Sequence, residues 1–177
     1  ARVPLITGQG IAVDADFSPD GKSLAYVSGL YGNPHIFRVD LSWDGGVKVP
    51  RVVGSKRLTY AGWYNTTPVF SPDSKQIVFS GFDKEAGFNN ASGRFDLFVM
   101  NIDGTNMERL TLKRANNESP TWAPNGQLVM FQSNRIGETD QKGTDQLYII
   151  NPKTGQTRMV VTGYYEAQAP RWSRNKG

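Results

Sequence analysis

Hydrophobic and polar residues alternate along most of this chain in short apolar runs that are separated by turn residues. One set of apolar runs, each shortly after a proline-containing turn, occupies residues 24–27, 77–79 and 129–131. A second set, rich in β-branched and aromatic residues, occupies residues 36–40, 97–101 and 147–151. Runs of this length and composition predict β-strands. Because no segment has the sustained 3.6-residue periodicity of an amphipathic helix, the pattern predicts an all-β fold.

A turn motif recurs along the chain at a nearly constant interval. It reads Phe-Ser-Pro-Asp-Gly-Lys at residues 17–22, Phe-Ser-Pro-Asp-Ser-Lys at 70–75 and Trp-Ala-Pro-Asn-Gly-Gln at 122–127, with 53 and then 52 residues between the turn prolines. Proline fixes φ near about −65°, and the glycine of the motif tolerates a positive φ. Ser74 replaces this glycine in the second copy. We therefore expect either a strained residue or a different turn there.

Each copy has the same order of predicted elements. A turn rich in Asp, Gly and Asn follows the second apolar run, and a last strand then ends near Thr59, Thr111 or Thr162. Four strands in each repeat, with an aromatic residue before each turn, indicate the blade of a β-propeller. A kelch-like repeat or a generic β-sandwich is the alternative, but sandwiches lack a fixed motif at each step.

The repeat makes residues 1–177 a single partial β-propeller. We expect an outer strand of a preceding blade at residues 1–10, complete blades at 11–59, 60–111 and 112–162, and a closing inner strand at 163–177. Closed propellers have about four to eight blades, so three blades with an orphan strand at each end do not close a ring. We expect the remaining blades to come from another chain or another segment.

Composition and charge narrow the classes of partner. The chain has 20 Lys and Arg, 16 Asp and Glu, a formal net charge of +4, and no cysteine. Its cations are scattered rather than gathered in a stripe beside exposed aromatic residues, so we expect no nucleic-acid binding. No apolar run reaches the length of about 18 residues that a membrane span needs, so we expect no direct membrane insertion. Without cysteine, disulfides and thiolate chemistry are excluded.

Candidate catalytic and metal-binding residues are few. His35 is the sole histidine and stands at the start of a predicted strand, where we expect a structural role rather than that of a general base. No Gly-x-Ser-x-Gly motif occurs, so a hydrolase nucleophile of that type is absent. Asp14, Asp16 and Asp20 suggest a calcium loop, but its turn glycine and closing acid positions hold proline and alanine. We therefore predict no enzyme activity, no cofactor and no metal site.

The turn motif, the apolar strand after it and the pattern of the following strands resemble the PD40-type blade of the TolB β-propeller. The segment 116–122 and the ending at 170–173 are also similar to that family. The resemblance implies the C-terminal half of a six-bladed propeller in a non-enzymatic, periplasmic protein of the bacterial cell envelope. In the Tol-Pal system, such a propeller docks the lipoprotein Pal over its channel mouth.

Two alternatives stay open because the same type of blade occurs in other proteins. One is a substrate-gating propeller fragment of a serine oligopeptidase, whose catalytic domain would lie elsewhere. The other is an accessory structural subunit of a larger envelope complex.

In a propeller, the connections from the outer strand of one blade to the inner strand of the next converge around the channel mouth. Here these are residues 60–67, 112–119 and 163–169, which combine aromatic, amide and charged groups as interface centres do. The residues that we expect to bind a protein partner are Tyr64, Asn65, Thr66, Arg114, Asn116, Asn117, Glu118, Tyr164, Tyr165 and Glu166. Alanine in place of Asn117 and Glu118 is expected to weaken partner binding without lowering thermal stability.

Overall fold

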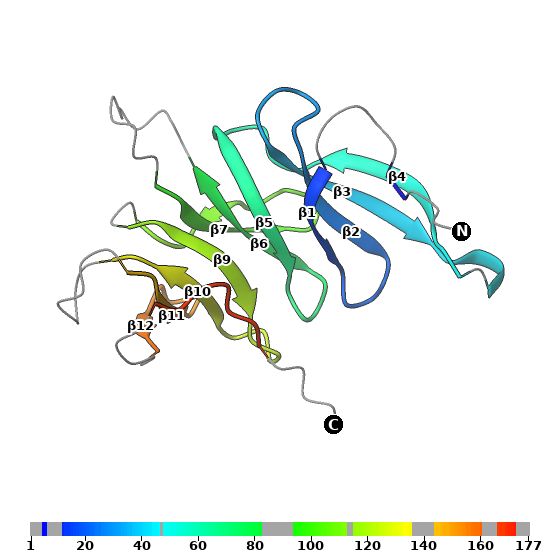
Figure 1. Ribbon diagram of the computed structural model, residues 1–177. Helices are drawn as coiled ribbons and strands as arrows, with labels where there is room; N and C mark the ends of the chain where they lie inside the picture. The colour runs from blue at the N-terminus through cyan, green and yellow to red at the C-terminus, as the bar shows by residue number, and fades with distance from the viewer. Residues whose placement is uncertain are drawn as a thin grey trace.

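Three four-stranded antiparallel sheets make up the computed structural model, which describes residues 5–6, 12–46, 48–82, 94–112, 115–135, 144–160 and 166–172 (Figure 1). The first sheet contains β1 (Ala12–Phe17), β2 (Ser23–Ser28), β3 (His35–Ser42) and β4 (Arg51–Arg57). The second contains β5 (Tyr64–Phe70), β6 (Gln76–Phe82), β7 (Asp96–Asn101) and β8 (Glu108–Arg109). The third contains β9 (Asn117–Trp122), β10 (Val129–Ser133), β11 (Gln146–Ile150) and β12 (Thr157–Met159). Strands that follow one another in sequence pair within each sheet, so the prediction of three propeller blades is confirmed.

Helical structure in the described part of the chain is limited to a short 3-10 turn at Asp44–Gly46. Nothing in that part has the length and apolar character that a helix needs to cross a bilayer.

Buried apolar side chains fill the spaces between neighbouring blades. The cluster between the first and second blades includes Ala25, Val27, Ile36, Ile77 and Phe79. The cluster between the second and third blades includes Val78, Leu97, Phe131, Tyr148 and Ile150. Successive residues of a strand point to opposite faces of the sheet, so β6 contributes Ile77 and Phe79 to one cluster and Val78 to the other. The second blade is therefore covered on both faces.

The turn motif has one conformation in all three copies. Gly21, Ser74 and Gly126 have φ values of 71°, 60° and 69°. Each donates its backbone N–H to the residue three positions earlier, at 2.8 to 2.9 Å. The second copy thus takes the first of the two expected outcomes: Ser74 adopts the strained left-handed backbone, and its Oγ accepts a hydrogen bond from the Asp20 N–H of the first blade at 3.1 Å.

The first described residues lie against the first blade, and the last described residues lie against the third. Leu5 and Ile6 pack on the apolar outer face of the first blade. At the other end, the N–H of Ala167 donates to Asp145 O at 2.8 Å, as Asn117 does to the corresponding carbonyl of the second blade at 2.9 Å. Residues 166–172 thus follow the course of an inner strand. They form no strand themselves, because no described strand pairs with them.

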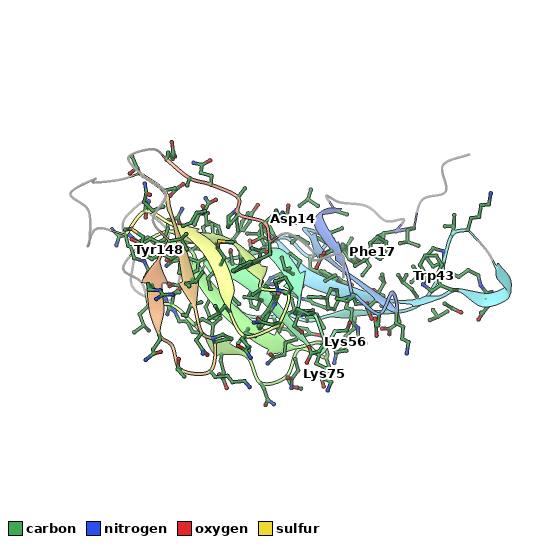
Figure 2. The ribbon with its side chains drawn as sticks, turned by 90° about the horizontal axis from the view of Figure 1, so that it is seen from below. Asp14, Phe17, Trp43, Lys56, Lys75 and Tyr148 are labelled. Carbon is green, nitrogen blue, oxygen red and sulfur yellow. The ribbon has the colours of Figure 1, made fainter. Side chains whose placement is uncertain are left out.

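A long hairpin distinguishes the first blade from the other two. Its outer strand, β4, has 7 residues, whereas β8 has 2 and β12 has 3. The hairpin of β3 and β4 extends away from the rest of the molecule and carries Trp43 (Figure 2). Trp43 is 48% exposed, and its indole N–H donates to Gly21 O at 2.7 Å. The repeat pattern did not predict this extension.

Candidate protein-docking site at the channel mouth

The inner strands β1, β5 and β9 lie side by side and run in the same general direction (Figure 1). They face a cavity of about 550 Å³. Its wall includes Asp14, Asp16, Phe17, Thr67, Phe70, Ser119, Trp122, Arg171 and Trp172. The described residues of the connections that precede β5 and β9 consequently lie at one end of the cavity, which we call the mouth, and the proline-containing turns lie at the other end.

A left-handed residue recurs at one position of the repeat. It is Asp14 (φ 51°) in β1, Thr67 (φ 49°) in β5, Ser119 (φ 53°) in β9 and Ala169 (φ 46°) in the last segment. Pairing with the next strand shifts register beside the first three of these residues, and such a bulge re-aims nearby side chains. Asp14 Oδ2 accepts a hydrogen bond from Thr66 Oγ1 at 2.5 Å, and Asp16 Oδ2 accepts one from the Phe70 N–H at 2.8 Å. Carboxylates of the first blade thus satisfy donors of the second.

Asp20, the third aspartate of the suggested calcium loop, has separate partners. It accepts hydrogen bonds from Ser18 Oγ at 2.6 Å and from the Lys22 N–H at 3.0 Å, within its own turn. The Ser18 hydrogen bond is the main cause of its lowered pKa. Across the described ranges, no three His, Asp or Glu side chains lie close enough together to hold a metal ion.

A hydrogen-bonded cluster joins the first and second blades at the mouth. Asn65 is 5% exposed, and its Nδ2 lies 3.2 Å from His35 Nδ1. The same ring nitrogen lies 3.2 Å from Thr59 Oγ1. Burial, and then the charge of Arg57, lower the pKa of His35. The imidazole is therefore neutral near pH 7 and has a structural environment, as the sequence predicted.

An equivalent cluster joins the second and third blades, with Asp96 in the place of His35. Asn117 is 1% exposed, and its Nδ2 donates to Asp96 Oδ1 at 3.2 Å. Its Oδ1 accepts hydrogen bonds from Ser133 Oγ at 2.9 Å and from Arg135 Nη2 at 2.8 Å. The Asn117 side chain is fully engaged inside the protein.

These contacts correct the expectation for Asn65 and Asn117. Their burial between blades removes both side chains from the surface that a partner can touch. Alanine at position 117 would remove one hydrogen bond each from Asp96, Ser133 and Arg135, and one such bond contributes about 0.5–1.5 kcal/mol, or more where a charged group takes part. Replacement of Asn117 is thus expected to lower stability, contrary to the expectation from the sequence.

The other predicted residues differ in accessibility. Tyr64 is 39% exposed and contacts Phe95 edge-to-face with 5.7 Å between the ring centroids. Asn116 is partly exposed and its Oδ1 accepts a hydrogen bond from the Phe95 N–H at 2.9 Å. Glu118 and Thr66 are partly exposed and Glu166 is exposed. Arg114, Tyr164 and Tyr165 lie outside the described residues.

Carboxylates gather at the mouth beside the third blade. Burial raises the pKa of Glu118, and the charge of Asp145 raises it further. The pKa of Asp145 is raised by burial and also by the charge of Glu166. Gln168 Nε2 bridges two of these groups, donating to Asp145 Oδ2 at 3.1 Å and to Glu166 Oε1 at 2.6 Å. Three carboxylates thus lie near one another among the described residues on this side of the mouth.

Beside the first blade, the mouth carries an arginine and two exposed aromatic rings, and this arginine was not among the predicted residues. The guanidinium carbon of Arg57 lies 5.7 Å from the ring centroid of Tyr31 and 4.9 Å from that of Tyr60. The two rings are 67% and 70% exposed. A signal was available in the sequence, because Arg-Leu-Thr at residues 57–59 recurs at 109–111.

Comparison with known proteins agrees with this geometry. The chain is 28% identical over 114 residues to the Tol-Pal system protein TolB of Hydrogenovibrio crunogenus, which covers 64% of this chain and 23% of that protein. The structure of an Agrobacterium tumefaciens protein described as a TolB matches with a TM-score of 0.63 and 23% identity, over 86% of this chain and 50% of that one. The fold is TolB-like. No protein-family model matches the chain.

The TolB-like blades also match propellers of peptidases. A puromycin-hydrolysing peptidase of Mycobacterium tuberculosis matches with a TM-score of 0.62 and 15% identity, over 92% of this chain and 23% of that one. An identity this low shows shared fold alone. The chain spans half or less of the length of each of these proteins, and it resembles part of TolB rather than all of it.

Proposed function

We propose that this chain is part of a non-catalytic, periplasmic β-propeller of the bacterial cell envelope, which holds a protein partner over its channel mouth. The observation that carries the proposal is the likeness to TolB in both sequence and fold. Because that relative is named as a Tol-Pal system protein, we propose a lipoprotein of the Pal type as the partner.

The composition of the mouth supports protein binding. Exposed Tyr60, Trp63 and Tyr64 supply large rigid side chains, and Glu118 and Glu166 supply polar groups beside the third blade. Aromatic anchors beside polar rims are typical of protein interfaces. We retain Tyr64, Thr66, Asn116, Glu118 and Glu166 as proposed contacts, together with Arg114, Tyr164 and Tyr165.

We also propose that further blades cover the outer face of the first blade, from another segment or another chain. Phe17, Phe70 and Trp122 occupy the same position of the repeat. Phe70 and Trp122 are buried against the preceding blade, at 4% and 6% exposure, whereas Phe17 is 52% exposed. An aromatic residue at this position is therefore buried only where a preceding blade is present.

The substrate-gating propeller of a serine oligopeptidase is the second candidate. The likeness of fold to the Mycobacterium tuberculosis peptidase favours it. A hydrolase domain in the full-length protein, with peptidase activity that a nucleophile variant abolishes, would establish this function instead.

The test of the proposed function is binding of the purified Pal-type lipoprotein of the same bacterium, measured by calorimetry. The double variant Tyr64→Ala, Glu166→Arg is expected to weaken binding at least about tenfold, since it removes an anchor and reverses a charge at the mouth. Lys75→Ala is the control, because Lys75 is exposed at the turn end of the cavity, away from the mouth. Equal affinities of the wild type and the mouth variant, or no binding by the wild type, would reject the proposal.

A further inference from the structure

Arg57 and Arg109 occupy the same position of the repeat but have different partners. Arg109 Nε donates to Thr111 O at 2.9 Å, and Arg57 Nε donates to Thr59 O at 2.7 Å. The Nη2 group of Arg109 forms an ion pair with Asp96 Oδ2. In the first blade the residue equivalent to Asp96 is His35. Because His35 has no carboxylate, Arg57 forms no equivalent ion pair with it.

The guanidinium of Arg57 consequently lacks a carboxylate. The ion pairs among the described residues are Arg38–Asp40, Arg51–Asp44 and Arg109–Asp96. Within those ranges, no carboxylate oxygen lies within 4.0 Å of a nitrogen of Arg57. The Nε hydrogen bond fixes the orientation of the side chain, and the Nη groups retain their donors for an external acceptor.

The rings of Tyr31 and Tyr60 make this site favourable for a carboxylate. They flank the guanidinium, reduce its contact with water and are themselves largely exposed at the mouth. A guanidinium binds a carboxylate through two parallel hydrogen bonds, which are stronger than hydrogen bonds between neutral groups. Tyrosine rings add apolar contact area without a large loss of conformational entropy.

We propose that Arg57, between Tyr31 and Tyr60, binds an aspartate or glutamate carboxylate in an acidic peptide segment of the partner. The inference rests on the proposed function, since it requires that the mouth faces a protein. It goes further in assigning the chemistry of the partner and its orientation. The acidic segment lies over the first two blades, because Glu118, Asp145 and Glu166 repel it from the third.

The experiment measures binding of a fluorescent, end-capped hexaglutamate peptide to the full chain by anisotropy. We expect saturable binding that weakens as salt is added, and no binding of a matched hexalysine peptide. His35 supplies a second readout, because it is the sole histidine and its NMR signal is unambiguous. A carboxylate bound at Arg57 adds negative charge beside the imidazole, so the peptide is expected to raise the pKa of His35.

Two variants test the site by different routes. Arg57→Gln removes the guanidinium, and His35→Asp supplies the carboxylate that Asp96 supplies in the second blade, so that Arg57 is already paired. Each is expected to weaken hexaglutamate binding at least about tenfold. Arg51→Gln is the matched control: it removes the same charge from the exposed hairpin, where Arg51 already pairs with Asp44 at 2.8 Å, and is expected to bind like the wild type.

Wild-type affinity in both Arg57→Gln and His35→Asp would overturn the assignment, as would equal weakening by Arg51→Gln, which would indicate a general charge effect. Thermal unfolding identifies a variant that fails to fold. If Arg57→Gln does not fold, His35→Asp decides, because the second blade tolerates the same arrangement. Hexaglutamate binding requires no lipoprotein, so its loss leaves the calorimetric test of the proposed function independent.

Discussion

Three equivalent buried positions, His35, Asp96 and Gln146, give the blade interfaces different chemistry. All three are the first residue of the third strand of a blade, and their exposure is 5%, 1% and 7%. A neutral imidazole, a carboxylate and an amide thus occupy one structural position. The interface between the first two blades is the one that holds a histidine, whose pKa is lowered by burial and by the charge of Arg57.

Stability is expected to fall between pH 7.5 and pH 5.5 because of His35. Burial and Arg57 lower its pKa in the folded protein, so the unfolded chain binds the proton more readily. The stabilisation is fully present above the unfolded pKa of about 6.5 and is lost as the pH falls through the folded value. Urea unfolding at the two pH values measures the difference. His35→Gln, which copies Gln146, is expected to show a smaller difference, and an unchanged one would assign the pH dependence to other groups.

Asn65 and Asn117 mark the limit of prediction from single residues. The sequence placed both in the connections at 60–67 and 112–119, whereas they lie in β5 and β9. The sequence also could not distinguish a surface amide from one that joins two blades. That distinction depends on His35 and Asp96, which are distant in sequence and come close only when the blades pack. The available signal was a Thr six residues before each Asn, at Thr59 and Thr111, since a purely functional contact need not recur at every blade.

The strands and turns were predictable because their signals are local. Apolar runs and the proline turns placed β2, β3, β6, β7, β10 and β11 near their observed bounds. The bulges of the inner strands were not predictable. Asp14, Thr67 and Ser119 adopt a positive φ although none of them is glycine. Their residue types do not predict this left-handed conformation, which packing imposes.

Packing between blades is expected to make equivalent aromatic residues unequal in energy. Phe70→Ala removes a side chain that is 4% exposed and should lower the free energy of unfolding by about 3–5 kcal/mol. Phe17→Ala alters the same position of the repeat at 52% exposure and should cost less than about 1 kcal/mol in this chain. Urea denaturation of both variants makes the comparison. Equal losses would mean that the outer face of the first blade is already covered.

At the scale of the whole molecule, the strands that the structure describes form a stack in which each blade contacts only the blades next to it. The second blade has apolar clusters on both faces, whereas the first and third have one neighbouring blade each. The fold class followed from the sequence because the repeat recurs at a nearly constant interval. The charge distribution of the mouth did not follow from the sequence, because Arg57 and Glu118 belong to different blades and their neighbours are set by how the blades pack.

Hydrogen exchange is expected to be slowest in the second blade. Amides of β6 and β7 exchange only when both neighbouring interfaces open, so they should report the highest opening free energy. Amides of β4 and β12, at the periphery, should exchange first. Exchange followed by mass spectrometry at peptide resolution measures the order. Strongest protection in the third blade would indicate that its outer face is closed in solution.

The long hairpin of the first blade has a consequence for recognition. Nearly identical repeats present several similar binding positions, so a partner can bind in more than one rotational setting. Trp43 and the β3–β4 hairpin occur on one blade among the three described, at the turn end, where Trp43 contacts Gly21. The hairpin makes the first blade different from the other two. It thereby breaks the rotational pseudosymmetry of the repeats, so that one rotational setting differs from the rest.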